Sequence, residues 1–204
     1  MKLTWEDKYK NLICRSVLMS KIILVTGGAR SGKSNFAEKL CMDRNNNTAY
    51  IATSIPFDDE MKDRVKKHQE NRPINWNTYE IYEDIYSIIK EIYTGHETVI
   101  LDCVTLLVNN LMFEHNLNIE ESSQEEINKL EQYIKEQVVK LIKEIEKTNL
   151  YFVFVTNELG MGIVPGNKLS RIYADIVGRI NQYIASKSNE VYFVVSGIPM
   201  KIKE

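Results

Sequence analysis

The sequence predicts an α/β domain with a mostly parallel sheet and helices on both of its faces. Apolar, β-branched segments of strand length recur along the chain, and segments of helical length separate them. Strands that alternate with helices form parallel sheets, because each helix carries the chain back to the same end of the sheet. No linker-like stretch divides the 204 residues, so one main domain is the simplest organisation.

The predicted strands are short apolar runs that stop at glycine or at polar residues. The run IILVT at 22–26 stops at Gly27, and ETVILD at 97–102 ends in an acid. Runs of this length and composition are typical of strands buried on both faces. The strands predicted in this way cover residues 22–26, 48–53, 76–81, 97–102, 151–156 and 190–196.

The predicted helices show apolar periodicity or an acidic first turn. Asp58, Asp59 and Glu60 begin one helix, and Pro73 follows its end. The longest helix has an apolar residue at every third or fourth position, and its charged remainder is the solvated face. These apolar residues are Ile127, Leu130, Ile134, Val138, Leu141 and Ile145. The helices cover residues 33–42, 58–70, 83–93, 104–113, 127–145 and 168–186, with a polar, mobile connection at 114–123.

The charge balance argues against nucleic acid as the main partner. Lys and Arg total 26 and Asp and Glu total 28, which gives a net charge of -2. A general nucleic-acid binder carries a positive field and a basic, aromatic stripe, and the sequence has neither.

The cysteines and the hydropathy pattern predict a cytoplasmic protein. Cys14, Cys41 and Cys103 are far apart and form no CxxC pair, so neither a disulfide framework nor a zinc cluster is indicated. No apolar run approaches the roughly 20 residues that cross a bilayer, and the mixed charges of residues 1–20 are unlike a signal peptide.

Residues 1–20 form an N-terminal extension that carries no motif of its own. They are either an appended helix or a segment foreign to the domain, which we expect to comprise residues 21–204. Met19 stands just before the first strand, so a chain that starts there is expected to fold and keep its activity.

A phosphate-binding motif follows the first strand. The sequence GGARSGKS satisfies G-x-x-x-x-G-K-[ST] between a predicted strand and a predicted helix. Glycines let backbone N–H groups approach phosphate oxygens, and the positive end of the next helix attracts them. The candidate nucleotide-binding residues are Gly27, Gly28, Ala29, Arg30, Ser31, Gly32, Lys33 and Ser34. In this setting the motif predicts a P-loop NTPase fold of the RecA-like kind, although a glycine-rich turn that binds nothing is the plainer alternative.

Three residues are candidates for the chemistry of phosphate transfer. Lys33 can reach the β- and γ-phosphates and is a candidate catalytic residue, while the Ser34 hydroxyl can ligate Mg²⁺. Asp102 ends a strand, where its carboxylate would project towards the same ion as a second ligand. Because apolar runs often end in Asp, an N-cap of the following helix is the alternative for Asp102.

Several further segments carry a resemblance to a known family. The loop GGARSGKS is followed in order by YIAT, FDDEM, RVKKHQENRP, VILDCVTLLVNNLMF, VTNELGMGIVPGN and VVSGIPMKIK. Together they resemble the bifunctional adenosylcobinamide kinase/adenosylcobinamide-phosphate guanylyltransferases of cobalamin biosynthesis, over about residues 21–203. The resemblance implies phosphorylation of adenosylcobinamide by ATP or GTP. It also implies transfer of GMP from GTP to adenosylcobinamide phosphate, and a homo-oligomer, with a trimer as its state.

The resemblance assigns the guanylylated nucleophile to His68. Family members often carry two adjacent histidines here, whereas this chain has Lys67 before His68. A neutral imidazole can attack the α-phosphorus of GTP, and Arg72 could neutralise phosphate charge. Without the resemblance, His68 is more simply a polar surface residue.

The resemblance also places guanine nucleotide contacts in two segments and at two separate acidic residues. Glu80 is a plausible base-selecting group, because a carboxylate accepts the N1–H and amino hydrogens that adenine lacks, but it could equally be an exposed strand residue. The loop at 157–167 is expected to line the cobinamide or nucleotide cleft, with a plain turn before the next helix as the alternative. The implied contacts are Thr53, Ser54, Ile55, Gln69, Glu70, Asn71, Arg72, Glu80 and Asp102.

Two other functions compete with the bifunctional transferase. One is a P-loop small-molecule kinase without guanylyl transfer, which the single histidine at 68 favours. The other is a RecA-like, nucleotide-dependent binding switch, which the near-neutral charge disfavours. Label from the α-phosphate of GTP is trapped on the protein only by the bifunctional enzyme.

Overall fold

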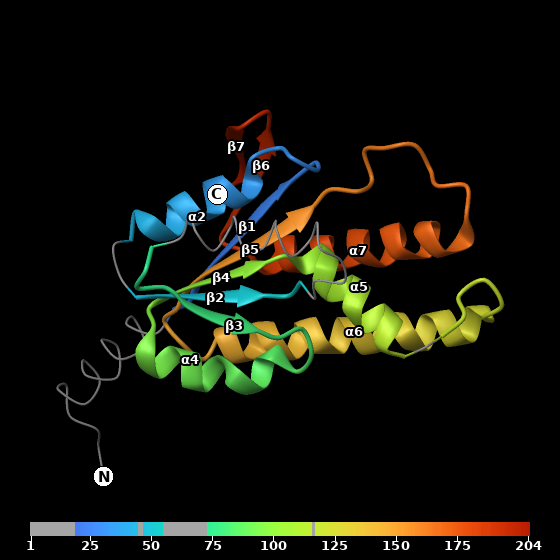
Figure 1. The fold of residues 1–204 in the computed structure, drawn as a ribbon, viewed down its shortest axis with the longest axis horizontal. Coiled ribbons are helices and arrows are strands. Elements are labelled where there is room, and N and C mark those ends of the chain that lie inside the picture. The colour runs from blue at the N-terminus through green and yellow to red at the C-terminus, as the bar shows by residue number, and fades with distance from the viewer. Residues whose placement is uncertain (1–18, 45–46, 55–72, 116) are drawn as a thin grey trace, which may run out of the picture.

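A seven-stranded sheet organises the computed structural model, which describes residues 19–44, 47–54, 73–115 and 117–204 (Figure 1). The strand order is β3-β2-β4-β5-β1-β6-β7. All neighbouring strands run parallel except β6 and β7, which are antiparallel. The strands are β1 Lys21–Gly27, β2 Thr48–Ala52, β3 Asn77–Glu80, β4 Thr98–Asp102, β5 Tyr151–Asn157, β6 Glu190–Val195 and β7 Ile198–Lys203. The predicted mostly parallel sheet is confirmed.

The described helices follow the predicted pattern closely. Only the segment predicted at 83–93 differs, because it begins as a 3-10 turn, η1, before the α-helix forms. The helices are α2 Lys33–Met42, η1 Ile85–Ile88, α4 Ile89–Gly95, α5 Val104–Glu114, α6 Gln124–Ile145 and α7 Lys168–Lys187. The helix predicted at 58–70 lies outside the described residues.

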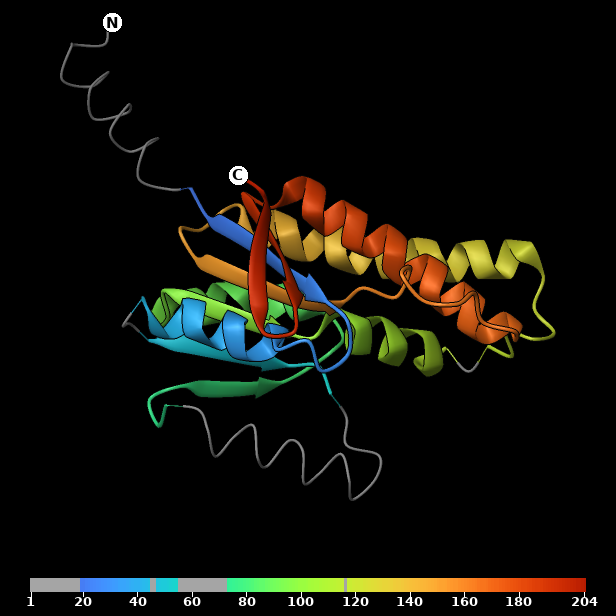
Figure 2. The same cartoon turned by 90° about the horizontal axis from the view of Figure 1, so that it is seen from above.

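Helices cover both faces of the sheet, as Figures 1 and 2 show. Alternate residues of β1 point to opposite faces. Ile22 and Leu24 join the core beneath α4 to α7, whereas Ile23 and Val25 pack with Ala37 of α2. The apolar stripe predicted for α6 is buried along its whole length. This burial on both sides explains why the strand sequences are continuous apolar runs rather than alternating ones.

Helices α5, α6 and α7 extend past the carboxyl ends of the strands (Figure 1). The connection between α5 and α6 is tied to α7 there, because the Lys168 ammonium donates to the carbonyls of Glu120 and Ser122. A capping box between Ser123 and Glu126 then begins α6. The mobility expected of this connection stays a prediction.

Strand β7 was not predicted from the sequence. It returns antiparallel to β6 through a two-residue turn in which Ser196 and Gly197 have φ of 50° and 81°. Positive φ at both positions is the signature of a type I′ hairpin. The sequence does contain a hairpin signal, because apolar residues alternate with Pro and Lys after Ser-Gly. The run is short, however, and it lies at the edge of the sheet.

No helix in the described part of the chain is long and apolar enough to span a membrane.

Candidate active site

The phosphate loop connects β1 to α2 in a conformation that requires glycine at two points. Gly32 has φ of 90°, which L-residues with a side chain rarely adopt. A Cβ on Gly27 would lie 2.5 Å from the carbonyl oxygen of Val194, so the loop leaves β1 against the backbone of β6. The Ser31 N–H donates to the carbonyl of Gly28 at 3.2 Å and closes the turn.

The turn of the β6–β7 hairpin supports this loop from outside. The Gly197 N–H donates to the carbonyl of Ser31 at 2.8 Å. A Cβ built on Gly32 would lie 3.1 Å from the Gly197 Cα, so the two backbones are in close contact. Figure 2 shows the hairpin beside the loop that follows β1. The phosphate loop is therefore shaped by residues about 165 positions later in the chain.

The polar groups of the loop suit an anion. Lys33 is only 8% exposed, and its ammonium donates to the Gly28 carbonyl at 3.1 Å. The buried Ser31 hydroxyl makes no hydrogen bond to any of the residues that the structure describes. Helix α2 begins here without a side-chain cap, so its positive end faces the loop. A phosphate group could accept from the Ser31 hydroxyl and from the backbone N–H groups at the start of α2.

Asp102 reaches the same edge of the sheet from the end of β4. Strand β5 separates β4 from β1, so Asp102 lies two strands from the phosphate loop. The Tyr50 hydroxyl donates to its Oδ2 at 3.1 Å, which holds the carboxylate in place. The alternative of an N-cap is not what the structure shows, because the residue before α5 is Cys103, and it makes no side-chain cap hydrogen bond.

Thr53 anchors the start of α5. Its hydroxyl donates to the Cys103 carbonyl and accepts from the Cys103 N–H, both at 2.8 Å, and its carbonyl accepts from the Asn110 side chain. Thr53 is 1% exposed, so in the described structure its side chain supports the start of α5. Its predicted nucleotide contact stays a prediction.

Cys103 is buried and directly follows Asp102. Burial, and then the Asp102 charge, raise the pKa of the Cys103 thiol to about 11, while the Lys33 charge opposes that rise. The thiol is therefore neutral at pH 7 and unsuited to nucleophilic attack.

Mg²⁺ fits this edge only as part of a nucleotide complex. Among the described residues, no group of three or more His, Cys, Asp or Glu side chains could hold a metal by itself. Ser34 on the first turn of α2 and Asp102 offer hard oxygen ligands, and phosphate oxygens would supply others. The donor set thus suits a Mg²⁺–triphosphate complex better than a resident ion.

The register brings another predicted residue to this edge. Glu80 and Asp102 both lie opposite Ala52, on either side of β2, and Glu80 is exposed. Ser54 follows β2 at the same end. The other predicted contacts, Ile55, His68, Gln69, Glu70, Asn71 and Arg72, lie outside the described residues.

The glycine-bearing loop after β5 also starts at this edge. The Glu158 N–H donates to the carbonyl of Gly27, so the loop begins beside the phosphate loop. The Arg171 guanidinium holds its far end through the Pro165 and Gly166 carbonyls at 3.1 and 2.6 Å. Between these anchors it exposes Met161, Ile163 and Val164 by 76%, 98% and 76%. Its predicted contact with cobinamide or nucleotide stays a prediction.

Comparison with known proteins identifies the family of the chain. Residues 23–202 match the family model of cobinamide kinase / cobinamide phosphate guanyltransferase. The chain belongs to this family. It is 43% identical over 182 residues to the bifunctional adenosylcobalamin biosynthesis protein CobU of Escherichia coli, a match that covers 89% of this chain and 99% of the relative.

Two further relatives support the assignment. CobU of Salmonella typhimurium is 42% identical over 182 residues, with the same coverage. The bifunctional protein CobP of Pseudomonas aeruginosa is 32% identical over 180 residues, which cover 88% of this chain and 96% of the relative. Membership in the cobinamide kinase and guanyltransferase family confirms three predictions: the family, the P-loop α/β fold and an enzyme with both activities.

Within this family fold, sequence reasoning missed two parts of the site. One is the β6–β7 turn with Gly197, which a pattern search at the chain end could have found. The other is a set of hydrogen bonds around Asn157, the last residue of β5, and Thr105. No local pattern identifies that pair, because 52 residues separate its members.

Proposed function

We propose that this chain phosphorylates the aminopropanol hydroxyl of adenosylcobinamide with ATP or GTP and then transfers GMP from GTP to the product. In the first reaction the hydroxyl oxygen bonds to the γ-phosphorus, and the bond from that phosphorus to the leaving nucleoside diphosphate breaks. In the second, adenosylcobinamide-GDP and pyrophosphate are formed. The family match over residues 23–202 is the observation that carries this proposal.

The phosphate loop supports the first reaction. Lys33 is held at the loop by burial and by the Gly28 carbonyl, so its charge is already in place when a triphosphate binds. Phosphoryl transfer depends on such positioning and electrostatic stabilisation, because the protein forms no covalent bond in it. When bound, Mg²⁺ would neutralise charge that develops on the phosphate oxygens, with Ser34 and Asp102 as its protein ligands.

The second reaction is proposed to pass through a guanylyl-histidine at His68. The imidazole nitrogen bonds to the α-phosphorus of GTP and pyrophosphate leaves. A phosphate oxygen of adenosylcobinamide phosphate then bonds to the same phosphorus, and the bond to the histidine breaks. Lys67 is a poor alternative nucleophile, because an amine of ordinary pKa is protonated near pH 7.

Trapping of GMP on the protein tests this step. The full chain is incubated with GTP labelled in the α-phosphate, and we expect a protein adduct that is labile to acid and stable to alkali, as a phosphoramidate is. His68→Ala should abolish both the label and GMP transfer while GTP still binds. Phosphorylation of adenosylcobinamide is assayed separately on the same protein.

Two other histidines provide matched controls. The His96 Nδ1–H donates to the Ile92 carbonyl and His115 packs edge-on against Tyr133, so both have structural contacts of their own. His96→Ala and His115→Ala should retain the label. If His68→Ala still traps label from GTP, Lys67 becomes the candidate and the assignment to His68 is wrong.

We also propose that the chain forms a homo-oligomer, with a trimer as the state implied by the family resemblance. The β6–β7 hairpin supports this, because it exposes Val195, Ile198, Met200 and Ile202 by 43% to 67% at the edge of the sheet. Apolar side chains gathered on an edge strand are typical of a protein interface. Sedimentation velocity of the full chain tests it, and a monomer at micromolar concentration would contradict it.

A further inference from the structure

Asn157 occupies a central position at the ligand-binding edge. It is the last residue of β5, the strand that lies between β1 and β4. In the register it stands directly opposite Gly27, the first residue of the phosphate loop. On the other neighbouring strand, β4, Asp102 stands opposite Val155, which precedes Asn157 by two residues. The side chain of Asn157 therefore arises between the phosphate loop and the carboxylate proposed to hold Mg²⁺.

A second residue holds the carboxamide of Asn157. Its Nδ2 donates to the Thr105 hydroxyl at 2.9 Å, from the end of β5 to the first turn of α5. Thr105 is itself fixed, since it is 2% exposed, lies 3.0 Å from the Cys103 sulfur and accepts from the Tyr173 hydroxyl at its carbonyl. In this orientation the Thr105 hydroxyl accepts one of the two amide hydrogens of Asn157.

The backbone at this position is held as well. The Asn181 side chain donates from Nδ2 to the Asn157 carbonyl at 3.1 Å, and its Oδ1 accepts from the Thr156 hydroxyl at 2.7 Å. Asn181 and Thr156 are buried. A network of uncharged polar groups in this setting gives a rigid geometry that apolar packing would not give. The Asn157 carboxamide is thus pre-oriented before any ligand binds.

We propose that Asn157 donates its second amide N–H to the phosphoryl group in transit during phosphorylation of adenosylcobinamide, and that Thr105 positions it. This inference rests on the kinase reaction proposed above. The amide stays neutral and forms no covalent bond: the substrate oxygen bonds to phosphorus, the bond to the leaving nucleoside diphosphate breaks, and the hydroxyl proton passes to solvent. A donor held in place before the reaction stabilises the charge on the equatorial oxygens without reorganisation.

Steady-state phosphorylation of adenosylcobinamide tests the role of Asn157. We expect Asn157→Ala to lower kcat about 100-fold, as loss of one pre-oriented donor does, while the Kd for ATP changes by less than about 3-fold. Asn157→Asp, nearly the same size, should lose at least as much, since a carboxylate has no N–H and repels phosphate. Asn128→Ala, an exposed asparagine of α6, is the control and should behave as the wild type.

The Thr105 variants separate positioning from a merely structural role. Thr105→Val keeps the shape but removes the acceptor, so kcat should fall about 10-fold, whereas Thr105→Ser keeps the hydroxyl and should restore kcat to within about 3-fold of the wild type. Thermal unfolding of each variant shows that it is folded. Equal kcat for the Val and Ser variants would overturn the positioning role.

The outcomes distinguish this inference from the function on which it rests. A wild-type chain that transfers no phosphate to adenosylcobinamide would overturn both together. A wild-type chain that is active, beside an Asn157→Ala variant with unchanged kcat, would overturn the role of Asn157 alone. So would a variant whose Kd for ATP rises while kcat is unchanged, because that result assigns Asn157 to ground-state binding.

Discussion

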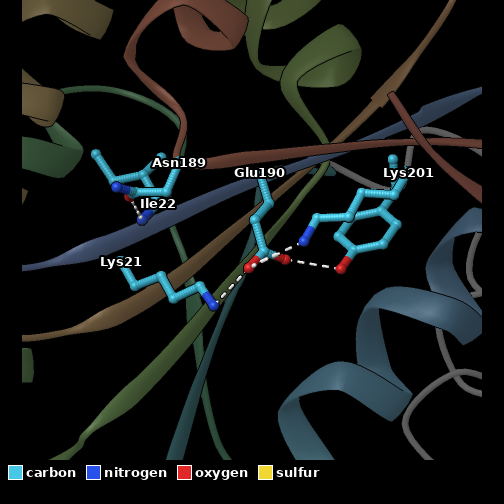
Figure 3. A network of polar contacts seen from close by, with 6 residues as sticks. Lys21, Ile22, Asn189, Glu190 and Lys201 are labelled. Carbon is cyan, nitrogen blue, oxygen red and sulfur yellow. Dashed lines mark hydrogen bonds and ion pairs between the residues drawn. The ribbon is translucent and has the colours of Figure 1, made fainter. Parts of the chain in front are cut away.

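The two ends of strand β1 both carry polar networks, but the networks are built differently. At the amino end, Glu190 contacts the ammonium groups of Lys21 and Lys201 and accepts from the Tyr192 hydroxyl at 2.7 Å (Figure 3). The two lysine side chains are 47% and 35% exposed. Water screens such charges, and ordering long side chains costs entropy, so the network stabilises the fold only slightly.

At the carboxyl end the network consists of backbone groups and short side chains. Gly27 fits against β6 with no room for a Cβ, Gly197 donates to the Ser31 carbonyl, and the charged Lys33 is buried. Here the groups are short and the Lys33 ammonium belongs to a buried side chain, so its charge is screened less than the charges of the exposed lysines at the amino end. The comparison indicates that the amino-end network only adds slightly to stability, whereas the carboxyl-end network has a geometry that suits a ligand.

Among substitutions at the two ends of β1, Lys33→Ala at the carboxyl end is expected to have the largest effect. Loss of this charge and donor should lower the rate of phosphate transfer roughly 30- to 1000-fold, because it acts on the triphosphate in the transition state. Folding should survive the change. Phosphorylation and GMP transfer are measured separately, and wild-type turnover in both would show that this loop is not the phosphate cradle.

A smaller effect, on stability, is expected from Gly27→Ala. The added Cβ would lie 2.5 Å from the Val194 carbonyl oxygen and 2.7 Å from the Ser31 hydroxyl oxygen. Overpacking of this kind costs about 1–3 kcal/mol of unfolding free energy. Gly28→Ala is the matched control, since its Cβ would meet no atom within 4 Å. Urea unfolding compares the two variants, and equal losses would show that the contact with β6 does not shape the loop.

The smallest effect is expected from Glu190→Gln at the amino end, about 0–1 kcal/mol of unfolding free energy. Hydrogen bonds from Lys21 and Tyr192 lower the pKa of Glu190. The ionised carboxylate therefore stabilises the fold at neutral pH, and this contribution is lost as the pH falls below the usual carboxyl pKa of about 4.3.

Urea unfolding of the wild type and Glu190→Gln at pH 7 and pH 3 measures this difference. The two proteins should converge at the lower pH and at high salt, and kinase turnover should be the same in both. If the difference in unfolding free energy grows in acid, or if turnover is lost, the amino-end network has a role beyond slight stabilisation of the fold.

Much of the fold follows from local sequence patterns. The apolar stripe of α6 has helical spacing, and the turn from β1 to α2 carries its own glycines and Lys33, so each is specified within a few residues. The same holds for the continuous apolar strands, which require burial on both faces. These elements were predicted to within a few residues of their bounds.

What the sequence by itself determined is therefore the P-loop α/β fold, the family and the residues of the phosphate motif. Only the tertiary structure decided that Gly197 supports Ser31, that Tyr50 holds Asp102 and that Thr105 orients Asn157. The physical reason is that these contacts depend on strand order and register. Strand order and register arise when distant segments pack together, and a local pattern of residue types does not contain them.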